Sequence, residues 1–251
     1  MYDFFKLLLF RPVVKFLFGA KLAGEENIPA TGGAVLAVNH IGAFETYALP
    51  ALMRRRLTFP AKAELFAGNR GLASKVVAWF LKGVGQVPLD RSVGRTSLYG
   101  LRPVLQVLED GGLVGIFPEG TRSPDGRLYR GKTGVARIAL TADVPVIPIA
   151  AFSTQTVRNR LGIPWVRKPR LVAGEPLHFP EYAGRGDDRE VIRWVTDEVM
   201  AGIQKLSGQT YVEAYASSVK YGSLTAEEAK AKELPRPGYG STPPALPAAE
   251  E

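Results

Sequence analysis

The chain has 251 residues, a net charge of +8 and no cysteine, and 46% of its residues are apolar. This apolar content is sufficient for a sizeable core, and the lack of cysteine excludes disulfide bonds and thiolate metal sites, which fits a reducing, cytoplasmic compartment. The first 221 residues carry +10, because residues 222–251 hold three cationic and five acidic side chains. Such a surplus favours anionic lipid head groups or a phosphorylated substrate, whereas the basic residues form no dense run and no nucleic-acid-binding signature, so no nucleic-acid partner is expected.

The first segment, residues 1–22, is rich in Phe, Leu and Val, but Lys6, Arg11, Pro12 and Lys15 interrupt it. No stretch approaches the roughly 18 to 20 apolar residues that a membrane-spanning helix needs, and the short apolar run also disfavours a signal peptide. Two interpretations stay open: short helices that lie at a membrane surface, or helices docked on the core of the domain.

Apolar, β-branched runs alternate with helical periodicity along most of the chain. Strands are expected at residues 35–38, 84–87, 113–117 and 144–150. Helices are expected at residues 98–108, 135–139 and 187–204. This alternation predicts an α/β domain over residues 23–221, with a mixed, mostly parallel sheet flanked by helices.

Residues 222–251 change composition to Ala, Glu, Lys and Pro. A segment of this kind cannot bury enough apolar surface to order itself. We therefore expect a flexible or loosely docked tail without catalytic residues.

Polar residues follow three of the expected strands. Asn39 and His40 follow the first strand, residues 88–91 follow the second, and residues 118–123 follow the third. In sheets of this type, ligands bind at the carboxyl ends of the strands. The polar residues therefore collect where the fold would place a site.

Residues 126–133, GRLYRGKT, match the phosphate-binding pattern GxxxxGKT. That loop requires a buried strand directly before its first glycine and small residues that wrap the phosphates. Here a turn, Ser-Pro-Asp, precedes the glycine, and the loop contains Arg, Leu and Tyr. A nucleotide hydrolase is therefore disfavoured; the end of the segment more plausibly opens a helix, with Arg130 and Lys132 on a basic rim.

His40 and Glu45 are the best candidates for chemistry. The chain has no cysteine and no GxSxG motif, and its two histidines lack the spacing of a zinc site, so we expect no metal. The second histidine, His178, is interpreted as structural. A histidine can take a proton from a hydroxyl at neutral pH, and a carboxylate on its other nitrogen fixes the tautomer. Within one continuous helix, residues five apart diverge, so convergence requires His40 in a loop, Glu45 in the first helical turn and a bend at Gly42.

A structural interpretation of the pair has equal weight at this point, because Glu45 could simply stabilise a helix N-terminus. Arg91 and Arg122, which follow neighbouring strands, favour chemistry, since two arginines beside a base suit a phosphate. Each arginine could instead form a surface ion pair, Arg91 with Asp90 and Arg122 with Glu119.

Four blocks of the chain together resemble the PlsC-type glycerolipid acyltransferases, which include lysophosphatidic acid acyltransferase. The first, NHIGAFE, resembles the family's NHx4D block; the others are GQVPLDR, FPEGTRS and VPVIP, at residues 39–45, 85–91, 117–123 and 144–148. The FPEGTRS block matches without change. Lys62 resembles a basic position between the first two blocks.

The resemblance implies a glycerol-3-phosphate acyltransferase-like fold with N-terminal helices at the cytoplasmic face of the membrane. It implies that His40, oriented by Glu45, deprotonates a hydroxyl of lysophosphatidic acid or glycerol 3-phosphate, which attacks an acyl thioester of coenzyme A or acyl carrier protein. The acceptor phosphate would be held by Lys62, Arg91 and Arg122 around a loop formed by Glu119, Gly120 and Thr121. No metal and no organic cofactor are implied, and nothing in the sequence indicates an oligomeric state.

One position departs from the pattern, because the family usually has aspartate where this chain has Glu45. The longer side chain bears on the acceptor and on the detailed geometry of the site more than on the reaction type. Two alternatives are therefore kept: an acyltransferase for a glycolipid or lyso-amino lipid, and a non-catalytic membrane-binding module.

Overall fold

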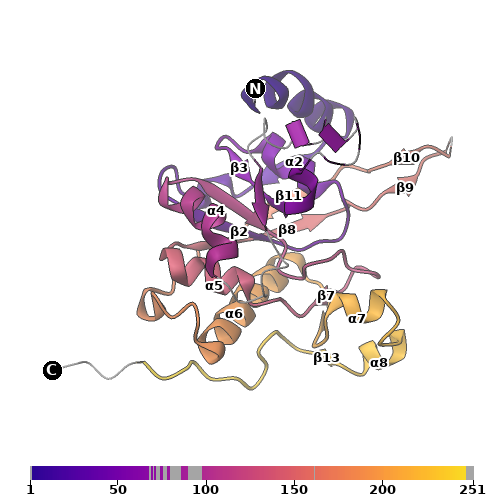
Figure 1. Ribbon diagram of the computed structural model, residues 1–251. Helices are drawn as coiled ribbons and strands as arrows, with labels where there is room; N and C mark the ends of the chain where they lie inside the picture. Colours follow the sequence, from indigo (N-terminus) through magenta and orange to yellow (C-terminus); the bar gives the residue numbers. More distant parts are fainter. Residues whose placement is uncertain are drawn as a thin grey trace.

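A six-stranded sheet forms the centre of the protein in the computed structural model, which describes residues 2–67, 69, 71, 74–75, 78–79, 86–89, 98–160 and 162–246 (Figure 1). The strand order is β1 (Lys21–Ala23), β11 (Arg170–Ala173), β8 (Val146–Phe152), β2 (Ala34–Val38), β6 (Leu113–Ile116) and β3 (Leu57–Thr58). The four strands from β8 to β3 run parallel. β11 is antiparallel to β8, and β1 is parallel to β11. The expected mixed, mostly parallel sheet is confirmed.

Of the second expected strand, at residues 84–87, residues 84 and 85 lie outside the described residues. The strand that is described here is β5 (Val87–Leu89), which pairs in parallel with β4 (Pro60–Lys62) in a separate two-stranded sheet. Each of these strands contains a proline, Pro88 or Pro60, which cannot donate a ladder hydrogen bond and so is confined to short or edge strands. The assumption that all three polar strand ends belong to one sheet is therefore wrong for this strand.

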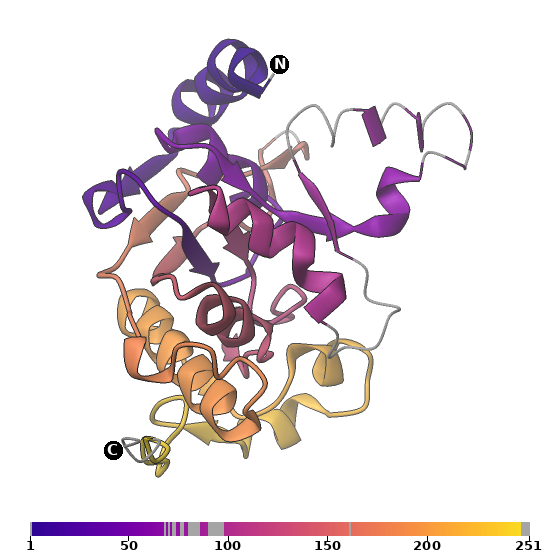
Figure 2. The same ribbon diagram turned by 60° about the vertical axis from the view of Figure 1, so that its left-hand side comes forward.

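Helices cover both faces of the sheet. β2 is buried on both sides, as is typical of a central parallel strand. Its Leu36 and Val38 join the apolar cluster that contains residues of α2 (Glu45–Leu52), whereas Val35 and Ala37 face the other cluster. On that second face lie α4 (Leu98–Glu109), α5 (Gly134–Ala142) and α6 (Arg189–Ser207), packed side by side (Figure 2).

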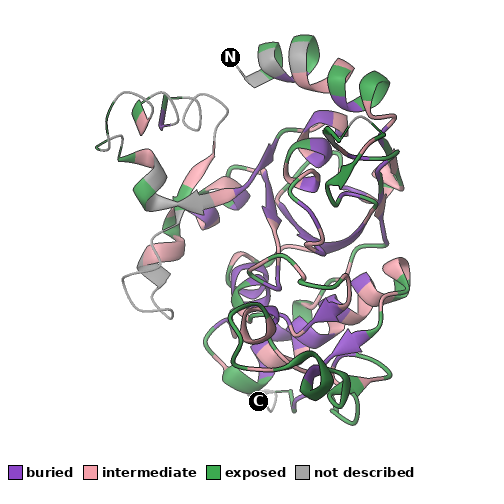
Figure 3. Cartoon of the chain, turned by 90° about the vertical axis from the view of Figure 1, so that its right-hand side faces the viewer, coloured by how far each residue is buried: buried purple, intermediate pink, exposed green. Residues whose placement is uncertain are grey.

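The N-terminal segment consists of α1 (Tyr2–Phe5) and two short π-helices, η1 (Lys6–Phe10) and η2 (Val13–Leu17). One side of it is docked: Lys6 Nζ donates to the carbonyl groups of Arg54 and Arg55, and Val14 is buried in the core. The other side exposes large apolar side chains, namely Phe4, Leu7, Leu8, Phe16 and Leu17. Features of both open interpretations are therefore present, as the burial colours of Figure 3 also show. Among the described residues, no helix has the length and apolar content to cross a bilayer.

Parts of the C-terminal segment contact the domain: the hydroxyl of Tyr182 donates to the carbonyl oxygen of Pro244, and Arg185 Nη1 donates to that of Ala245. β12 (Tyr211–Val212) pairs with β13 (Glu233–Leu234) and with β7 (Leu128–Tyr129). Between β12 and β13 lie α7 (Ala216–Lys220) and α8 (Ala226–Lys230). A capping box between Thr225 and Glu228 starts α8, and Ala229 is fully buried. Strand pairing and helix caps order this segment without a high apolar content.

Candidate active site

The two candidate catalytic side chains converge at the end of β2. His40 lies in the loop after the strand and Glu45 is the first residue of α2, so the loop-and-first-turn arrangement that convergence required is present. His40 Nδ1 lies 2.9 Å from Glu45 Oε1. Glu45 is fully buried, whereas the His40 side chain is 18% exposed. Within the described part of the chain, no group bonds to His40 Nε2, so this nitrogen is available to a substrate.

Gly42 makes the tight turn between the two residues possible. Its backbone N–H donates to Glu45 Oε1 at 2.9 Å. A Cβ on Gly42 would lie 2.1 Å from the carbonyl oxygen of Thr154, so no larger residue fits without a backbone shift. Glu45 Oε1 thus accepts from both the turn and the imidazole.

Aromatic rings fix the plane of the imidazole. Phe117 stacks on His40 with ring centroids 4.1 Å apart, and Phe59 stacks on Phe117 with ring centroids 5.3 Å apart. Phe117 directly follows β6, the parallel neighbour of β2. The first and third blocks of the sequence therefore meet at the same edge of the sheet.

Glu119 joins these two blocks. Its Oε1 accepts from the backbone N–H of His40 at 2.9 Å, and its Oε2 accepts from the backbone N–H of Tyr129 at 3.1 Å. Burial raises the pKa of Glu119 to about 8, although the two backbone hydrogen bonds act in the opposite direction. In return, the backbone N–H of Ser123 donates to the carbonyl oxygen of His40 at 2.7 Å. Glu119 and Ser123 therefore both hold the loop that carries His40.

Cationic side chains surround the turn after Glu119. Gly120 has a φ of +71°, and a Cβ there would lie 3.0 Å from the Lys132 side chain. Lys220 Nζ, from α7, donates to Thr121 Oγ1 at 3.1 Å. Arg122 is exposed and forms no ion pair with any described residue, so the alternative pair of Arg122 with Glu119 does not occur. The turn is thus bordered by exposed positive charge that could meet an anion.

Two predicted phosphate-binding residues are not placed in the site by the structure. Lys62 is the last residue of β4, a strand that contacts β6. Arg91, together with Asp90, lies outside the described residues. Residues 126–133 contain β7 and lead into α5, so a strand lies inside the GxxxxGKT pattern, whereas a phosphate-binding loop needs the strand before its first glycine. In the described part of the chain, no three acidic or histidine side chains gather as a metal site would require.

Sequence reasoning assigned no role to Asn39 and Lys220. The buried Asn39 side chain accepts from the backbone N–H of Ala151 and donates to its carbonyl oxygen, which continues the β2–β8 pairing up to His40. Its place directly before the histidine was a usable signal. Lys220 gave none, because only the pairing of β12 with β7 brings it near Thr121.

Comparison with known proteins shows the family of this chain. The family model described as Acyltransferase matches residues 19–151. The chain is 31% identical to the 1-acyl-sn-glycerol-3-phosphate acyltransferase of Bacillus subtilis, over 66% of this chain and 77% of that protein. It is 34% identical to the chloroplastic 1-acyl-sn-glycerol-3-phosphate acyltransferase BAT2 of Brassica napus, over 66% of this chain and 46% of that protein, so it spans less than half of the plant relative. The chain belongs to the PlsC-type acyltransferase family.

A solved structure shows the same fold. The crystal structure of the 1-acyl-sn-glycerophosphate (LPA) acyltransferase PlsC from Thermotoga maritima superposes with a TM-score of 0.55 at 24% identity, covering 80% of this chain and 79% of the other. The expected acyltransferase-like α/β fold is thereby confirmed.

Proposed function

We propose that this protein transfers a fatty acyl chain from a thioester of coenzyme A or acyl carrier protein to a hydroxyl of 1-acylglycerol 3-phosphate, in phospholipid synthesis. The observation that carries the proposal is the 2.9 Å contact between His40 Nδ1 and Glu45 Oε1, with Nε2 left for a substrate. The names of the relatives support the acceptor, because the bacterial and the plant protein are both described as acting on this lipid.

The proposed reaction begins at His40 Nε2, which takes the proton of the acceptor hydroxyl. The hydroxyl oxygen then attacks the thioester carbonyl carbon, and the tetrahedral intermediate expels the thiolate, which recovers the proton from the imidazolium. Glu45 holds the tautomer with the proton on Nδ1 and stabilises the imidazolium while it exists. The proton returns to the leaving group, so no metal or organic cofactor is required in this scheme.

The acceptor phosphate is proposed to bind at the turn formed by Gly120 and Thr121. Arg122 is exposed beside this turn and suits bidentate contact with a phosphate. Lys62 and Arg91 remain proposed phosphate ligands on the strength of the family resemblance. The location of the turn, directly after Glu119, whose side chain accepts from the backbone N–H of His40, supports this assignment.

The N-terminal segment is proposed to lie on the cytoplasmic face of the membrane, as a peripheral attachment. Phe16 is 79% exposed and Leu8 is 68% exposed, which is unfavourable in water and favourable at the boundary of lipid head groups and acyl chains. A membrane position would also bring the protein to its acceptor, which is itself a lipid.

Product mass spectrometry on the purified protein tests the proposal. The protein is offered 1-acylglycerol 3-phosphate and glycerol 3-phosphate, each with acyl-coenzyme A and with acyl carrier protein thioester. We expect diacylglycerol 3-phosphate as the main product. Acylation of glycerol 3-phosphate alone would make glycerol 3-phosphate the acceptor. Acylation of a glycolipid or lyso-amino lipid instead would make that lipid the acceptor. No product with any acceptor would favour a non-catalytic membrane-binding module.

A further inference from the structure

We propose that the hairpin of β9 (Val157–Arg158) and β10 (Pro164–Trp165) is a second membrane contact, which binds the phosphate groups of anionic phospholipids through Arg160 and Arg167. This inference rests on the membrane position given to the protein under the proposed function. It adds a binding surface in a different part of the chain.

Charge is concentrated around this hairpin. Between Asp143 and Glu175 the chain contains no acidic residue, but it contains five cationic ones, Arg158, Arg160, Arg167, Lys168 and Arg170. All five are exposed. Arg170 lies over the ring of Phe152. Neither Arg160 nor Arg167 forms an ion pair or hydrogen bond with any described residue, so both guanidinium groups can meet an external anion.

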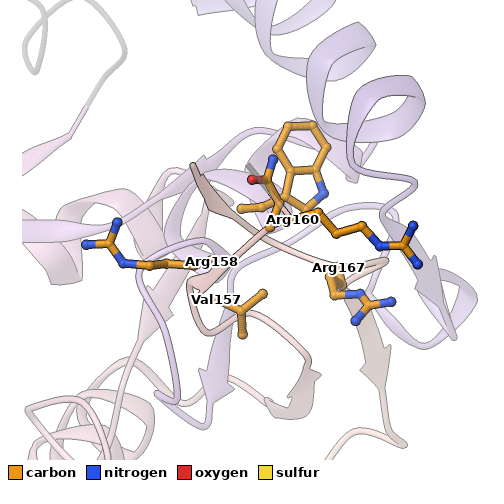
Figure 4. A pocket seen from close by; sticks show the side chains of 6 residues that line it. Val157, Arg158, Arg160 and Arg167 are labelled. Atoms are coloured by element: carbon orange, nitrogen blue, oxygen red, sulfur yellow. The ribbon is translucent and has the colours of Figure 1, made fainter. Parts of the chain in front are cut away.

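The hairpin also forms a small open cavity. Its volume is about 310 Å³, and it is lined by Val157, Arg158, Asn159, Arg160, Trp165 and Arg167. Figure 4 shows the guanidinium groups of Arg160 and Arg167 extending toward the same side, while Arg158 extends the opposite way. Arg158 Nη1 is engaged within the hairpin, where it donates to the carbonyl oxygen of Gly162. The two remaining arginines are therefore the pair that can act on one ligand surface.

Apolar side chains accompany the positive charge. Val157 is 43% exposed and Ile163 is 51% exposed on the same hairpin. The two strands pair over only two residues each, and an isolated two-stranded hairpin is marginally stable in water. Exposed arginines beside exposed aliphatic groups match a lipid surface, where phosphates lie next to the acyl boundary.

Aromatic contacts connect the hairpin to the N-terminal segment. Trp165 and Phe18 have ring centroids 4.8 Å apart, and Phe18 in turn contacts Phe44 at 4.8 Å. Phe18 directly follows η2, and Phe44 directly precedes Glu45. The hairpin is therefore continuous with the proposed membrane-facing segment and lies close to the start of the helix that carries Glu45.

Vesicle co-sedimentation tests the inference on the full chain. Vesicles of phosphatidylcholine alone are compared with vesicles of phosphatidylcholine and phosphatidylglycerol, using wild type and the double variant Arg160→Gln/Arg167→Gln. Each neutralised arginine is expected to weaken partition onto the anionic vesicles about fivefold, or about thirtyfold for both, with little change on the neutral vesicles. High salt should reduce the difference, because it screens exposed charges.

The matched control is Arg189→Gln/Lys205→Gln, which removes two exposed cations from α6 and leaves the hairpin intact. An equal loss in the control, or no loss in the hairpin variant, overturns the inference, as does a wild type that binds neither kind of vesicle. If the hairpin variant keeps vesicle binding but loses binding to acyl carrier protein, the hairpin is a protein-docking surface and the lipid assignment is wrong.

Failure of this inference and failure of the proposed function give different results. Vesicle partition is measured without any acyl donor, whereas the product assay uses a water-soluble, short-chain acceptor without vesicles. If the wild type transfers acyl chains but the hairpin variant binds vesicles normally, the proposed lipid contact is wrong and the proposed function stands. If the wild type has no transferase activity but its vesicle binding depends on Arg160 and Arg167, the proposed function is wrong and the lipid contact stands.

Discussion

The buried carboxyl group of Glu119 accepts a hydrogen bond from the backbone N–H of His40 at 2.9 Å. The two residues are far apart in sequence, and they come together because β2 and β6 are parallel neighbours whose carboxyl ends share one edge of the sheet. The hydrogen bond positions the backbone of the histidine, while Glu45 positions its ring. Two acidic side chains thus position His40, Glu119 through its backbone N–H and Glu45 through its ring.

The elevated pKa of Glu119 predicts a pH dependence of stability. Its folded-state pKa of about 8 lies above the ordinary value of 4.5, so between these values the folded state keeps a proton that the unfolded state has lost. The stabilisation is therefore fully present below about pH 4.5 and is lost as the pH rises through about 8. Inside this window the free energy of unfolding should fall by up to about 1.4 kcal/mol per pH unit.

Urea unfolding of wild type and Glu119→Gln at several pH values from 5 to 8 measures this effect. Glutamine keeps the shape of the side chain but cannot titrate. Its amide NH2 group must face one of the two backbone N–H donors, which lowers the free energy of unfolding by about 1–3 kcal/mol at every pH. The wild-type advantage should shrink as the pH rises. A constant difference across the range would show that Glu119 does not titrate there.

His40→Ala should reduce kcat by about 10²- to 10⁴-fold, since a general base typically contributes that much. His178, the only other histidine in the chain, provides a control. Its side chain is half exposed, and its Nε2 lies 3.9 Å from Asp143 Oδ1. His178→Ala should keep activity close to wild type. Acyl transfer by His40→Ala within about tenfold of wild type would rule out general-base catalysis at this site.

The β2 turn shows why part of the site could be predicted from sequence. An apolar run followed by Asn39 and His40, with Gly42 and Glu45 next, contains both the strand and the bend. For the His40 and Glu45 side chains to converge, His40 had to lie in a loop before the helix, and the structure has that loop. Local spacing was sufficient because the partners lie only five residues apart.

Longer-range partners gave no comparable signal. The contact of Lys220 with Thr121 depends on the pairing of β12 with β7, which no local periodicity encodes. The docking of residues 226–234 likewise depends on a strand pairing, together with one capping box, rather than on apolar content. Composition indicates how much apolar surface a segment can bury, but it does not indicate with which strand the segment pairs.

Gly42→Ala should impair both stability and catalysis. The new methyl group would meet the Thr154 carbonyl oxygen, so the loop must shift, at a cost of about 1–3 kcal/mol in the free energy of unfolding. A displacement of the imidazole by about 1 Å can lower kcat about 100-fold. Gly134→Ala is the control: no atom lies within 4 Å of its Cβ position, and it begins α5, so stability should rise by about 0.4–1 kcal/mol. Urea unfolding and steady-state kinetics of both variants provide the comparison, and wild-type kinetics for Gly42→Ala would contradict the close-approach argument.

Arg122→Ala should raise the acceptor KM by about tenfold or more, as expected for loss of a charge-assisted contact with a phosphate. Lys220→Ala should raise it less, up to about fivefold, because an exposed charged contact contributes at most about 1 kcal/mol. In both variants, kcat should change less than the acceptor KM does. Lys230→Ala, an exposed lysine on α8, is the control for general loss of charge. An unchanged acceptor KM in Arg122→Ala would remove Arg122 from the phosphate site, and a raised KM for the thioester donor instead would assign these cations to the donor.

Substitutions of Glu45 separate the length of its side chain from its charge. Glu45→Asp withdraws the carboxylate from His40 Nδ1 and from the Gly42 N–H by about one C–C bond length, so both 2.9 Å contacts lengthen. We expect kcat to fall about tenfold from this misplacement, with little change in KM. Glu45→Gln keeps the length but cannot stabilise the imidazolium, and its kcat should fall on the order of 10⁴-fold, as for loss of the charged partner in a histidine dyad. Both are measured with 1-acylglycerol 3-phosphate and with glycerol 3-phosphate. Because aspartate is the residue that the family usually has here, unchanged activity and acceptor preference in Glu45→Asp would show that the longer acid is an equivalent orienter. A change of preferred acceptor would instead make the side chain at this position a determinant of specificity.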